Sequence, residues 1–441
     1  MTDREPYSDR RPAASVVVPV YNKAPHLKAC FDCLERQTIS KSDLEVLLID
    51  DGSTDESLAL CEAFAAERPW VRVIAQSNAG VSEARNAGIR AARGRYLFFL
   101  DPDDSLSPET LENVSKFFES CPEEVELATY PIVSIRDGKR QRLHHRYDVL
   151  RETGVYDLTL PENATIAQAT MNVAVRNRFD GNVLFDFAPA NGVIVHEDEK
   201  YCTDVLQRSM QLGFCAEAEY RWMRSDEGAS TALRQPERLY GNNIALFEDF
   251  FGRYGNEVPL YIQGLLVNDL SWKLKAGIAL PTHLEGAAYD RALGRLGSLM
   301  ERVDDDLVLR HPNLREEHRL FALSLKRREP LRWRVAPGAL AVLRGDALVF
   351  AAGCASATLT RIAVRDGELH VSGTLSSPFF AGWGGGVELL LRRRPRKADR
   401  GGSADTLVLT EAVEGCPTAT VRLGRSFQFS FARDLGESED I

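Results

Sequence analysis

The sequence has no apolar run that approaches the roughly 20 residues needed to span a bilayer. Its N-terminal stretch, MTDREPYSDRRPAAS, also lacks the apolar core of a signal peptide. A surplus of positive charge is absent too, because the net charge is -10, and this argues against nucleic acid as the main partner. We therefore expect a soluble, cytoplasmic protein, with a peripheral position at the inner face of the membrane as an alternative.

Cysteine is scarce, with 8 residues in a chain of 441, which excludes a disulfide scaffold. Cys30 and Cys33 form a CxxC pair, but no second pair follows at the spacing of a zinc site. They share a helical apolar face with Leu27 and Leu34. Packing inside the protein explains this pair better than metal or redox chemistry.

What is present begins with four apolar runs that alternate with segments of helical period. The length predicts two or three domains, of which these runs form the first. The spacing predicts right-handed βαβ units and an open α/β sheet with helices on both faces. The four predicted strands are Ser15–Val20, Leu44–Ile49, Val71–Ile74 and Tyr96–Leu100.

Polar residues follow each of these strands, and ligands of such sheets bind where the carboxyl ends of the strands meet. The last strand is followed by three acids within four residues, Asp101, Asp103 and Asp104. Their carboxylates repel one another unless water or a cation neutralises them, and hard divalent cations prefer oxygen ligands. If this acid cluster stood by itself, a solvated turn before a helix would explain it equally well. Convergence of four strand ends favours a binding site, formed by Tyr21, Asn22, Asp50, Asp51, Asn78, Asp101, Asp103 and Asp104.

Two common nucleotide-binding motifs are missing. No GxGxxG opens the first helix and no GxxxxGK[ST] occurs, which argues against a classical dinucleotide site and a P-loop enzyme. Acids at strand ends can still hold a base and a ribose by hydrogen bonds and a diphosphate through a bridging cation. The pattern therefore indicates a nucleotide-sugar site.

Four segments, VVVPVYNK, LLIDDGSTD, NAGVSEARNAGI and YLFFLDPDD, resemble in order and spacing the family 2 glycosyltransferases of GT-A fold. The resemblance is strong over about residues 14–120. It implies a Rossmann-like catalytic domain with a mixed, mostly parallel sheet, and Mn²⁺ or Mg²⁺ as cofactor. It also implies nucleoside contacts for Pro19, Tyr21 and Asp51, a place near the nucleotide for Arg85, a ribose contact for Asp101, and metal contacts for Asp103 and Asp104; Asn22 and Asn78 are further candidates at the same strand ends.

The segment VIVHED, residues 193–198, reads as a strand that ends in acids, with a helix following through about Leu212. It resembles the ED segment of the family, which implies Asp198 as the catalytic base and Glu197 as its support. The alternative is that Glu197, Asp198 and Glu199 are acids favoured in the first turn of a helix. His196 and Asp204 are weaker candidates for the base.

Residues 220–231, YRWMRSDEGAST, resemble the segment that closes the nucleotide pocket in soluble members, where Arg221 or Arg224 would face the diphosphate. The processive, membrane-embedded synthases carry QxxRW, whereas Ala218 stands three positions before Arg221. This departure disfavours a synthase of that type.

The rest of the chain changes character twice. We expect a flexible lead over 1–13, a GT-A domain over 14–234 (a nucleotide-binding half to 120 and an acceptor half beyond it), a helical linker over 235–335 and a β-sandwich over 336–441. This arrangement resembles wall teichoic acid glycosyltransferases, which implies a homo-oligomer, a trimer, formed through the β domain. The basic run Arg392–Lys397 is either a solvated loop or a dock for an anionic acceptor polymer.

These features together predict an inverting glycosyltransferase that moves a sugar from a nucleotide sugar, a UDP-sugar, to a hydroxyl of an anionic or neutral envelope polymer such as teichoic acid or polysaccharide. One alternative is a metal-dependent sugar nucleotidyltransferase. Such enzymes carry a Gly/Arg-rich loop after the first strand, and VPVYNK is not one. The other alternative is a non-catalytic polymer-binding module on the same fold.

Overall fold

The computed structural model describes residues 11–136, 139–143, 149–168, 170–186, 196–223, 243–275 and 286–326, and further strands between 331 and 434. The chain divides into two compact units, residues 1–268 and 269–441, each taken by itself below. Over the described ranges, no helix combines the length and the apolar character that crossing a membrane requires.

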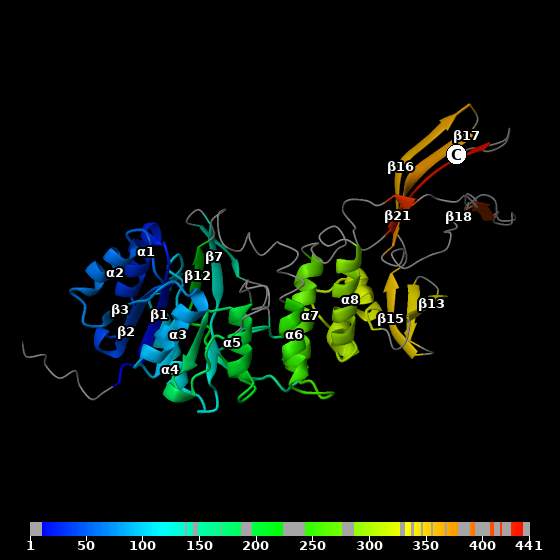
Figure 1. Cartoon of the computed structure of the whole chain (residues 1–441). Helices are drawn as coiled ribbons and strands as arrows, with labels where there is room; N and C mark the ends of the chain where they lie inside the picture. The colour runs from blue at the N-terminus through cyan, green and yellow to red at the C-terminus, as the bar shows by residue number, and fades with distance from the viewer. Residues whose placement is uncertain are drawn as a thin grey trace, which may run out of the picture. The chain divides into compact units, whose positions relative to one another are not determined.

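The first unit is built on a sheet of eight strands (Figure 1). β1, β2, β3 and β4 are parallel, β10 is antiparallel to both of its neighbours, and β11 runs parallel to β6 and antiparallel to β9. The mixed, mostly parallel α/β sheet is therefore as predicted. In spatial order the strands are β3 (Val71–Ala75), β2 (Leu44–Asp50), β1 (Ala14–Val20), β4 (Tyr96–Phe99), β10 (Val173–Arg176), β6 (Leu127–Thr129), β11 (Gln211–Phe214) and β9 (Gly154–Asp157).

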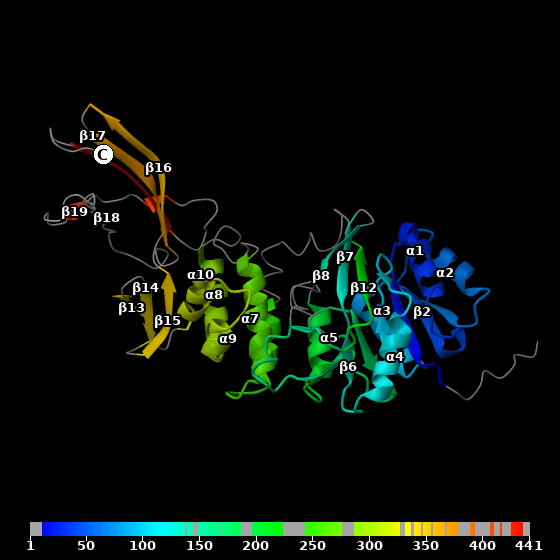
Figure 2. The same cartoon turned by 180° about the vertical axis from the view of Figure 1, so that it is seen from behind.

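The central strands are buried on both faces, which explains their unbroken apolar sequences. Every residue of β1, β2 and β4 is buried, as expected for parallel strands covered by helices. In Figures 1 and 2, α1 and α2 lie on the other side of β1–β3 from α3. The helices of this part are α1 (Ala24–Glu35), α2 (Ser57–Ala65), α3 (Val81–Ala91) and α4 (Thr110–Ser120).

Helix α3 packs unusually close to β1. A Cβ added at Gly88 would lie 2.3 Å from Cγ1 of Val17, so only glycine allows this approach. Ala84, one turn earlier, is fully buried. These small residues allow the helix to pack closely on the sheet, and they bring the start of α3 to the edge where β1, β2 and β4 end.

A second, four-stranded sheet has the order β5 (Ser105–Leu106), β12 (Tyr220–Met223), β7 (Ile132–Arg136) and β8 (Lys139–Leu143). β12 pairs antiparallel with β5, so Tyr220 lies opposite Leu106 and Arg221 opposite Ser105. This pairing places residues 220–223 beside the acid cluster that follows β4.

One boundary prediction was wrong. The helix predicted through about Leu212 is α5, Glu197–Leu206. The chain reverses at Met210, which has a φ of 55°, and Leu212 then pairs with Leu127 as part of β11. Pairing with β6 buries Leu212 and Phe214 fully. Tertiary packing, rather than local periodicity, therefore makes this segment a strand. The strand predicted just before α5 falls on 193–195, outside the described residues.

Within the range 235–335, where a helical linker was predicted, the described residues form helices from Asn243 to Ser324 and a strand from Leu331. The helices are α6 (Asn243–Gly252), α7 (Leu260–Lys275), α8 (Gly286–Met300), α9 (Asp305–Leu309) and α10 (Glu316–Ser324), and the division between the units falls within α7. The acid run at 304–306 has structural roles: Asp304 caps α9 by accepting from the backbone N–H of Asp306 at 2.8 Å, and Asp305 pairs with Lys326.

The remaining strands of the second unit form separate small sheets. β16 and β17 form a hairpin in which Arg365 pairs with Glu368. The β-sandwich and the domain boundaries stay predictions. The strands are β13 (Leu331–Ala336), β14 (Ala339–Arg344), β15 (Ala347–Gly353), β16 (Ser356–Arg365), β17 (Glu368–Ser377), β18 (Leu389–Arg392), β19 (Thr406–Leu409), β20 (Gly415–Cys416) and β21 (Arg425–Asp434).

Candidate active site

The loop after β1 is tied to the loop after β2. Asn22, with a left-handed φ of 51°, donates its backbone N–H to Oγ of Ser53 at 3.1 Å and accepts from the backbone N–H of Thr54 at 2.8 Å. Tyr21 beside it is 47% exposed, which leaves its ring open to stack on a base. Pro19 is buried within β1, opposite Ile49. These bonds fix the two loops as one rigid edge.

Asp51, at the end of β2, holds the loop that precedes α3. It is only 3% exposed. Its Oδ1 accepts from Nε2 of Gln76 at 2.7 Å and from the N–H of Ala79 at 2.9 Å, and its Oδ2 accepts from the N–H of Gly80 at 2.8 Å. Asn78 lies exposed on this loop. In this structure Asp51 therefore shapes the predicted nucleoside site through the neighbouring backbone.

The close fit of this loop also requires Gly52. Its φ is 73°, and a Cβ at this position would lie 2.8 Å from the backbone nitrogen of Asn78. Only glycine combines that conformation with that clearance.

Arg85, on α3, joins two acids from distant parts of the chain. It is 4% exposed, and its Nη2 lies 3.1 Å from Oδ1 of Asp101 while its Nη1 lies 3.1 Å from Oε1 of Glu197. Burial opposes its charge, but the surrounding acids outweigh that cost and raise its pKa above the ordinary value. Asp101 ends β4 and Glu197 begins α5, so one buried cation connects the two halves of the predicted site.

Asp198 lies next to this ion-pair cluster in the first turn of α5. Burial, followed by the negative charge of Glu197, raises its pKa to about 7, against the opposing effects of Arg85 and His196. Its Oδ1 accepts from the N–H of Glu199 at 3.0 Å. A carboxylate with a pKa near neutrality is suited to accept a proton.

Asp204, the weaker candidate, is held differently from Asp198. It accepts from Nζ of Lys200 and from Nη1 of Arg253, both at 2.6 Å. The pair with Lys200 lies within α5 and the pair with Arg253 connects α5 to the residue after α6, which favours a structural role for Asp204.

The three acids after β4 have different partners. Asp103 accepts from Nζ of Lys23 at 2.7 Å, and its side chain is 39% exposed. Asp104 is buried, and its two oxygens accept from the hydroxyl of Tyr220 and from the N–H of Met223, each at 2.8 Å. Burial, and then the charge of Asp101, raise the pKa of Asp104 to about 8.

The fit of a divalent cation differs between the two predicted metal ligands. Asp103 presents a partly exposed carboxylate whose partner is a flexible lysine, and it fits a hard cation. Both oxygens of Asp104 instead hold β12, which favours a structural role over the predicted metal contact. Within the described ranges, no group of three or more His, Cys, Asp or Glu side chains is arranged to hold a metal by itself. Oxygens of a bound diphosphate would therefore have to complete the coordination.

The predicted arginines of the closing segment are only partly described. Arg221 lies on β12 with its side chain 39% exposed, and its Nε donates to Oε1 of Glu219 at 2.8 Å. Arg224 lies outside the described residues. Sequence reasoning missed two residues that the structure brings to the site, Lys23 and Tyr220. Both stand inside segments singled out above, but nothing local indicates their partners, which are 80 and 116 positions away.

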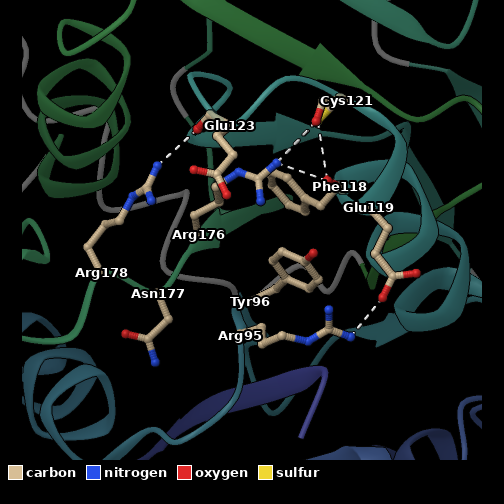
Figure 3. A pocket seen from close by; sticks show the side chains of 9 residues that line it. All are labelled: Arg95, Tyr96, Phe118, Glu119, Cys121, Glu123, Arg176, Asn177 and Arg178. Carbon is tan, nitrogen blue, oxygen red and sulfur yellow. Dashed lines mark hydrogen bonds and ion pairs between the residues drawn. The ribbon is translucent and has the colours of Figure 1, made fainter. Parts of the chain in front are cut away.

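A pocket of about 380 Å³ opens at the other end of β4 (Figure 3). It is lined in part by Arg95, Tyr96, Phe118 and Arg176. Nη2 of Arg176 donates to the backbone oxygen of Phe118 at 2.9 Å, and Arg95 pairs with Glu119. The pocket contains none of the predicted site residues, and its guanidinium groups have structural partners.

Comparison with known proteins identifies a matching family profile and several relatives. The profile described as glycosyl transferase family 2 matches residues 15–186. The minor teichoic acid biosynthesis protein GgaB of Bacillus subtilis is 26% identical over 322 residues, 71% of this chain and 35% of that protein. Its relative GgaA, from the same organism, is 28% identical over 266 residues, 57% of this chain and 58% of that protein. The chain thus spans less than two thirds of the length of either relative.

Among solved structures, S. aureus TarS 1–349 in complex with UDP-GlcNAc superimposes with a TM-score of 0.57 at 18% identity, over 76% of this chain and 97% of that one. That likeness shows a shared fold. The matched profile therefore identifies a glycosyl transferase family 2 domain over residues 15–186, and the superposition shows that this part of the chain has a GT-A fold.

Proposed function

We propose that this protein is an inverting glycosyltransferase that moves a sugar from a UDP-sugar to a hydroxyl of a cell-envelope polymer, a teichoic acid or a related polysaccharide. The observation that carries the proposal is the ion-pair cluster on Arg85. It joins Asp101, at the predicted donor side, to Glu197, next to the predicted base. A donor site and a proton acceptor are the two parts that sugar transfer requires.

The donor would occupy the edge formed by the loops after β1, β2 and β4. The exposed ring of Tyr21 is available to stack on the base. The side chain of Asp101 is 38% exposed and can accept from a ribose hydroxyl. Asp103 would hold Mn²⁺ or Mg²⁺, which when bound neutralises charge on the departing diphosphate.

Asp198 would take the proton from the acceptor hydroxyl. As the acceptor oxygen bonds to the anomeric carbon, the bond from that carbon to the diphosphate oxygen breaks and UDP leaves with its electron pair. Attack from the face opposite the diphosphate inverts the anomeric centre, as at the opposed carboxylates of inverting hydrolases. The pKa of about 7 leaves Asp198 sufficiently deprotonated to act near neutral pH.

The choice of donor and acceptor is supported by the relatives. TarS was crystallised with UDP-GlcNAc, and the names of GgaB and GgaA place them in minor teichoic acid biosynthesis. Action at the inner face of the membrane and assembly into a trimer through the C-terminal strands belong to the same proposal. The basic run that would dock an anionic polymer falls largely on 393–397, outside the described residues.

The test is nucleotide release from a panel of UDP-sugars, with and without teichoic acid acceptors, in Mn²⁺ and after chelation by EDTA. We expect UDP to be released in Mn²⁺ and release to stop in EDTA. Release of inorganic diphosphate from UTP and a sugar 1-phosphate, with no UDP released from any UDP-sugar, would instead show a nucleotidyltransferase. Binding of UDP and polymer with no release from any donor would show a binding module.

A further inference from the structure

The predicted metal ligand Asp103 already has a cation from its own chain. Nζ of Lys23 lies 2.7 Å from Oδ2 of Asp103, and the two side chains are 34% and 39% exposed. A lysine ammonium carries one charge on a flexible stem, with three donors that can change partner. This pair occupies the oxygen at which a divalent cation would bind.

The backbone of Lys23 is held by hydrogen bonds, so the fold fixes the point from which its flexible side chain extends. Its N–H donates to Oγ of Ser57 at 2.8 Å, and the N–H of Ala24 donates to Oδ2 of Asp55 at 3.2 Å. Asp55 lies in the loop after β2 and Ser57 begins α2, whereas Asp103 follows β4. Three strand ends thus meet at this one residue.

We propose that Lys23 is an internal counter-cation of the donor site. It neutralises Asp103 while no divalent cation is bound, and it turns to the diphosphate of the donor when a cation takes the carboxylate. The proposal rests on the proposed function, since it assigns Asp103 and the diphosphate to one place. It makes Lys23 a positioning residue for the donor, a role that the four sequence motifs do not indicate.

Lys23 should affect the two ligands in opposite directions, because a free Mn²⁺ ion is a cation whereas the donor brings an anionic diphosphate. An ammonium at 2.7 Å from Asp103 repels a second cation that approaches the same oxygen. The diphosphate of a nucleotide sugar carries about two negative charges, which a divalent cation balances, so the charge of Asp103 is left uncompensated and Lys23 still has an anion within reach. Lys23 should therefore oppose the binding of Mn²⁺ alone and favour the binding of UDP with Mn²⁺.

The test measures Mn²⁺ binding by electron paramagnetic resonance and UDP binding by calorimetry in saturating Mn²⁺, on the full chain and its Lys23→Gln variant. For a partly exposed ion pair we expect Mn²⁺ alone to bind about two- to fivefold more tightly to the variant. UDP in Mn²⁺ should bind about two- to fivefold more weakly. Tighter binding of Mn²⁺ alone together with weaker binding of UDP in Mn²⁺ by the same variant is the result that supports the proposal.

Two variants serve as controls. Lys23→Arg keeps the charge and should resemble the unaltered protein in both measurements. Lys28→Gln removes a lysine from the same helix, where Lys28 pairs with Asp32 at 2.9 Å and is 85% exposed, and should change neither affinity. A melting temperature like that of the unaltered protein will show that each variant is folded.

The outcomes separate this inference from the proposed function. The inference is overturned if Lys23→Gln binds Mn²⁺ with the same affinity as the unaltered protein, or more weakly. In that case the proposed function still stands, provided that the unaltered protein binds UDP in Mn²⁺. An unaltered protein that binds no UDP in Mn²⁺ overturns both.

Discussion

At the scale of single residues, the site depends on a buried arginine with two carboxylate partners. Breaking a buried ion pair by removing one partner typically costs about 3–5 kcal/mol, because the other charge stays behind without compensation. A change at Arg85 would therefore affect folding and activity together. Asp198 allows a cleaner test, because an amide can replace its carboxylate at nearly the same size, whereas Glu197 is itself an ion-pair partner of Arg85.

Asp198→Asn should keep donor binding and lower turnover by about 10²- to 10⁴-fold, the usual contribution of a general base. An amide fills the same space but cannot take the proton of the acceptor. The measurements are the rate of UDP release and the Kd for UDP in Mn²⁺. Asp180→Asn, at an exposed position, is the matched control. Unchanged turnover in Asp198→Asn would move the role of base to another acid.

Glu197→Gln should move the rising limb of the pH profile of kcat/KM to lower pH. Asp198 must be deprotonated to act, so the rate should rise with pH through its pKa of about 7. The negative charge of Glu197 raises that pKa, and an amide removes the charge. Glu83→Gln on α3, where Glu83 pairs with Arg90, is the control and should leave the limb in place. A limb that stays fixed in Glu197→Gln would contradict the assignment.

At the scale of elements, the short strand β12 is fastened to the turn after β4. The hydroxyl of Tyr220 donates to Asp104 and accepts from the backbone N–H of Asp101 at 3.3 Å. Both contacts are on the side chain of a buried residue, so the pairing of β12 with β5 and the geometry of the acid turn depend on each other.

Tyr220→Phe should lower the free energy of unfolding by about 1–3 kcal/mol, because it leaves an oxygen of buried Asp104 without its donor. UDP binding in Mn²⁺ should weaken as the turn loosens. Denaturant unfolding and calorimetry measure the two effects. The matched control is Tyr156→Phe, whose hydroxyl donates to the backbone oxygen of Glu152 in an exposed bond and should change stability by less than about 0.5 kcal/mol. Equal losses in the two variants would count against the role of Tyr220.

At the scale of the molecule, all described site residues lie in the first compact unit, which ends at Asn268 within α7. The ion pair that joins α5 to the residue after α6 also lies inside this unit. The donor site should therefore be complete without the strands of the second unit.

A fragment of residues 1–275, which keeps α7 whole, should bind UDP in Mn²⁺ with the affinity of the full chain. Calorimetry on both proteins measures this, and the fragment with Asp103→Ala should lose the Mn²⁺ dependence. A folded fragment that has lost UDP binding would show that the second unit contributes to the donor site.

Much of the fold could be predicted from the sequence because it depends on local pattern. The unbroken apolar runs of β1, β2 and β4 and the small residues of α3 indicated buried parallel strands under a close helix, as observed. β11 was missed, since its pairing with β6 overrides a pattern that also suits a helix. The sequence did not indicate that Asp103 would pair with a lysine and Asp104 with a tyrosine, because the two carboxylates are chemically identical and lie in the same turn.

The sequence by itself determined the resemblance to family 2 glycosyltransferases, the alternation of strands and helices up to β4, and the acids at the strand ends, because periodicity and motif spacing are properties of neighbouring residues. Only the tertiary structure decided the partner of each acid. Those partners are 80, 112 and 116 positions away in the pairs Lys23–Asp103, Arg85–Glu197 and Tyr220–Asp104. Whether a carboxylate binds a metal, acts as a base or holds a strand in place depends on its burial and on the hydrogen-bond donors that the fold brings to it.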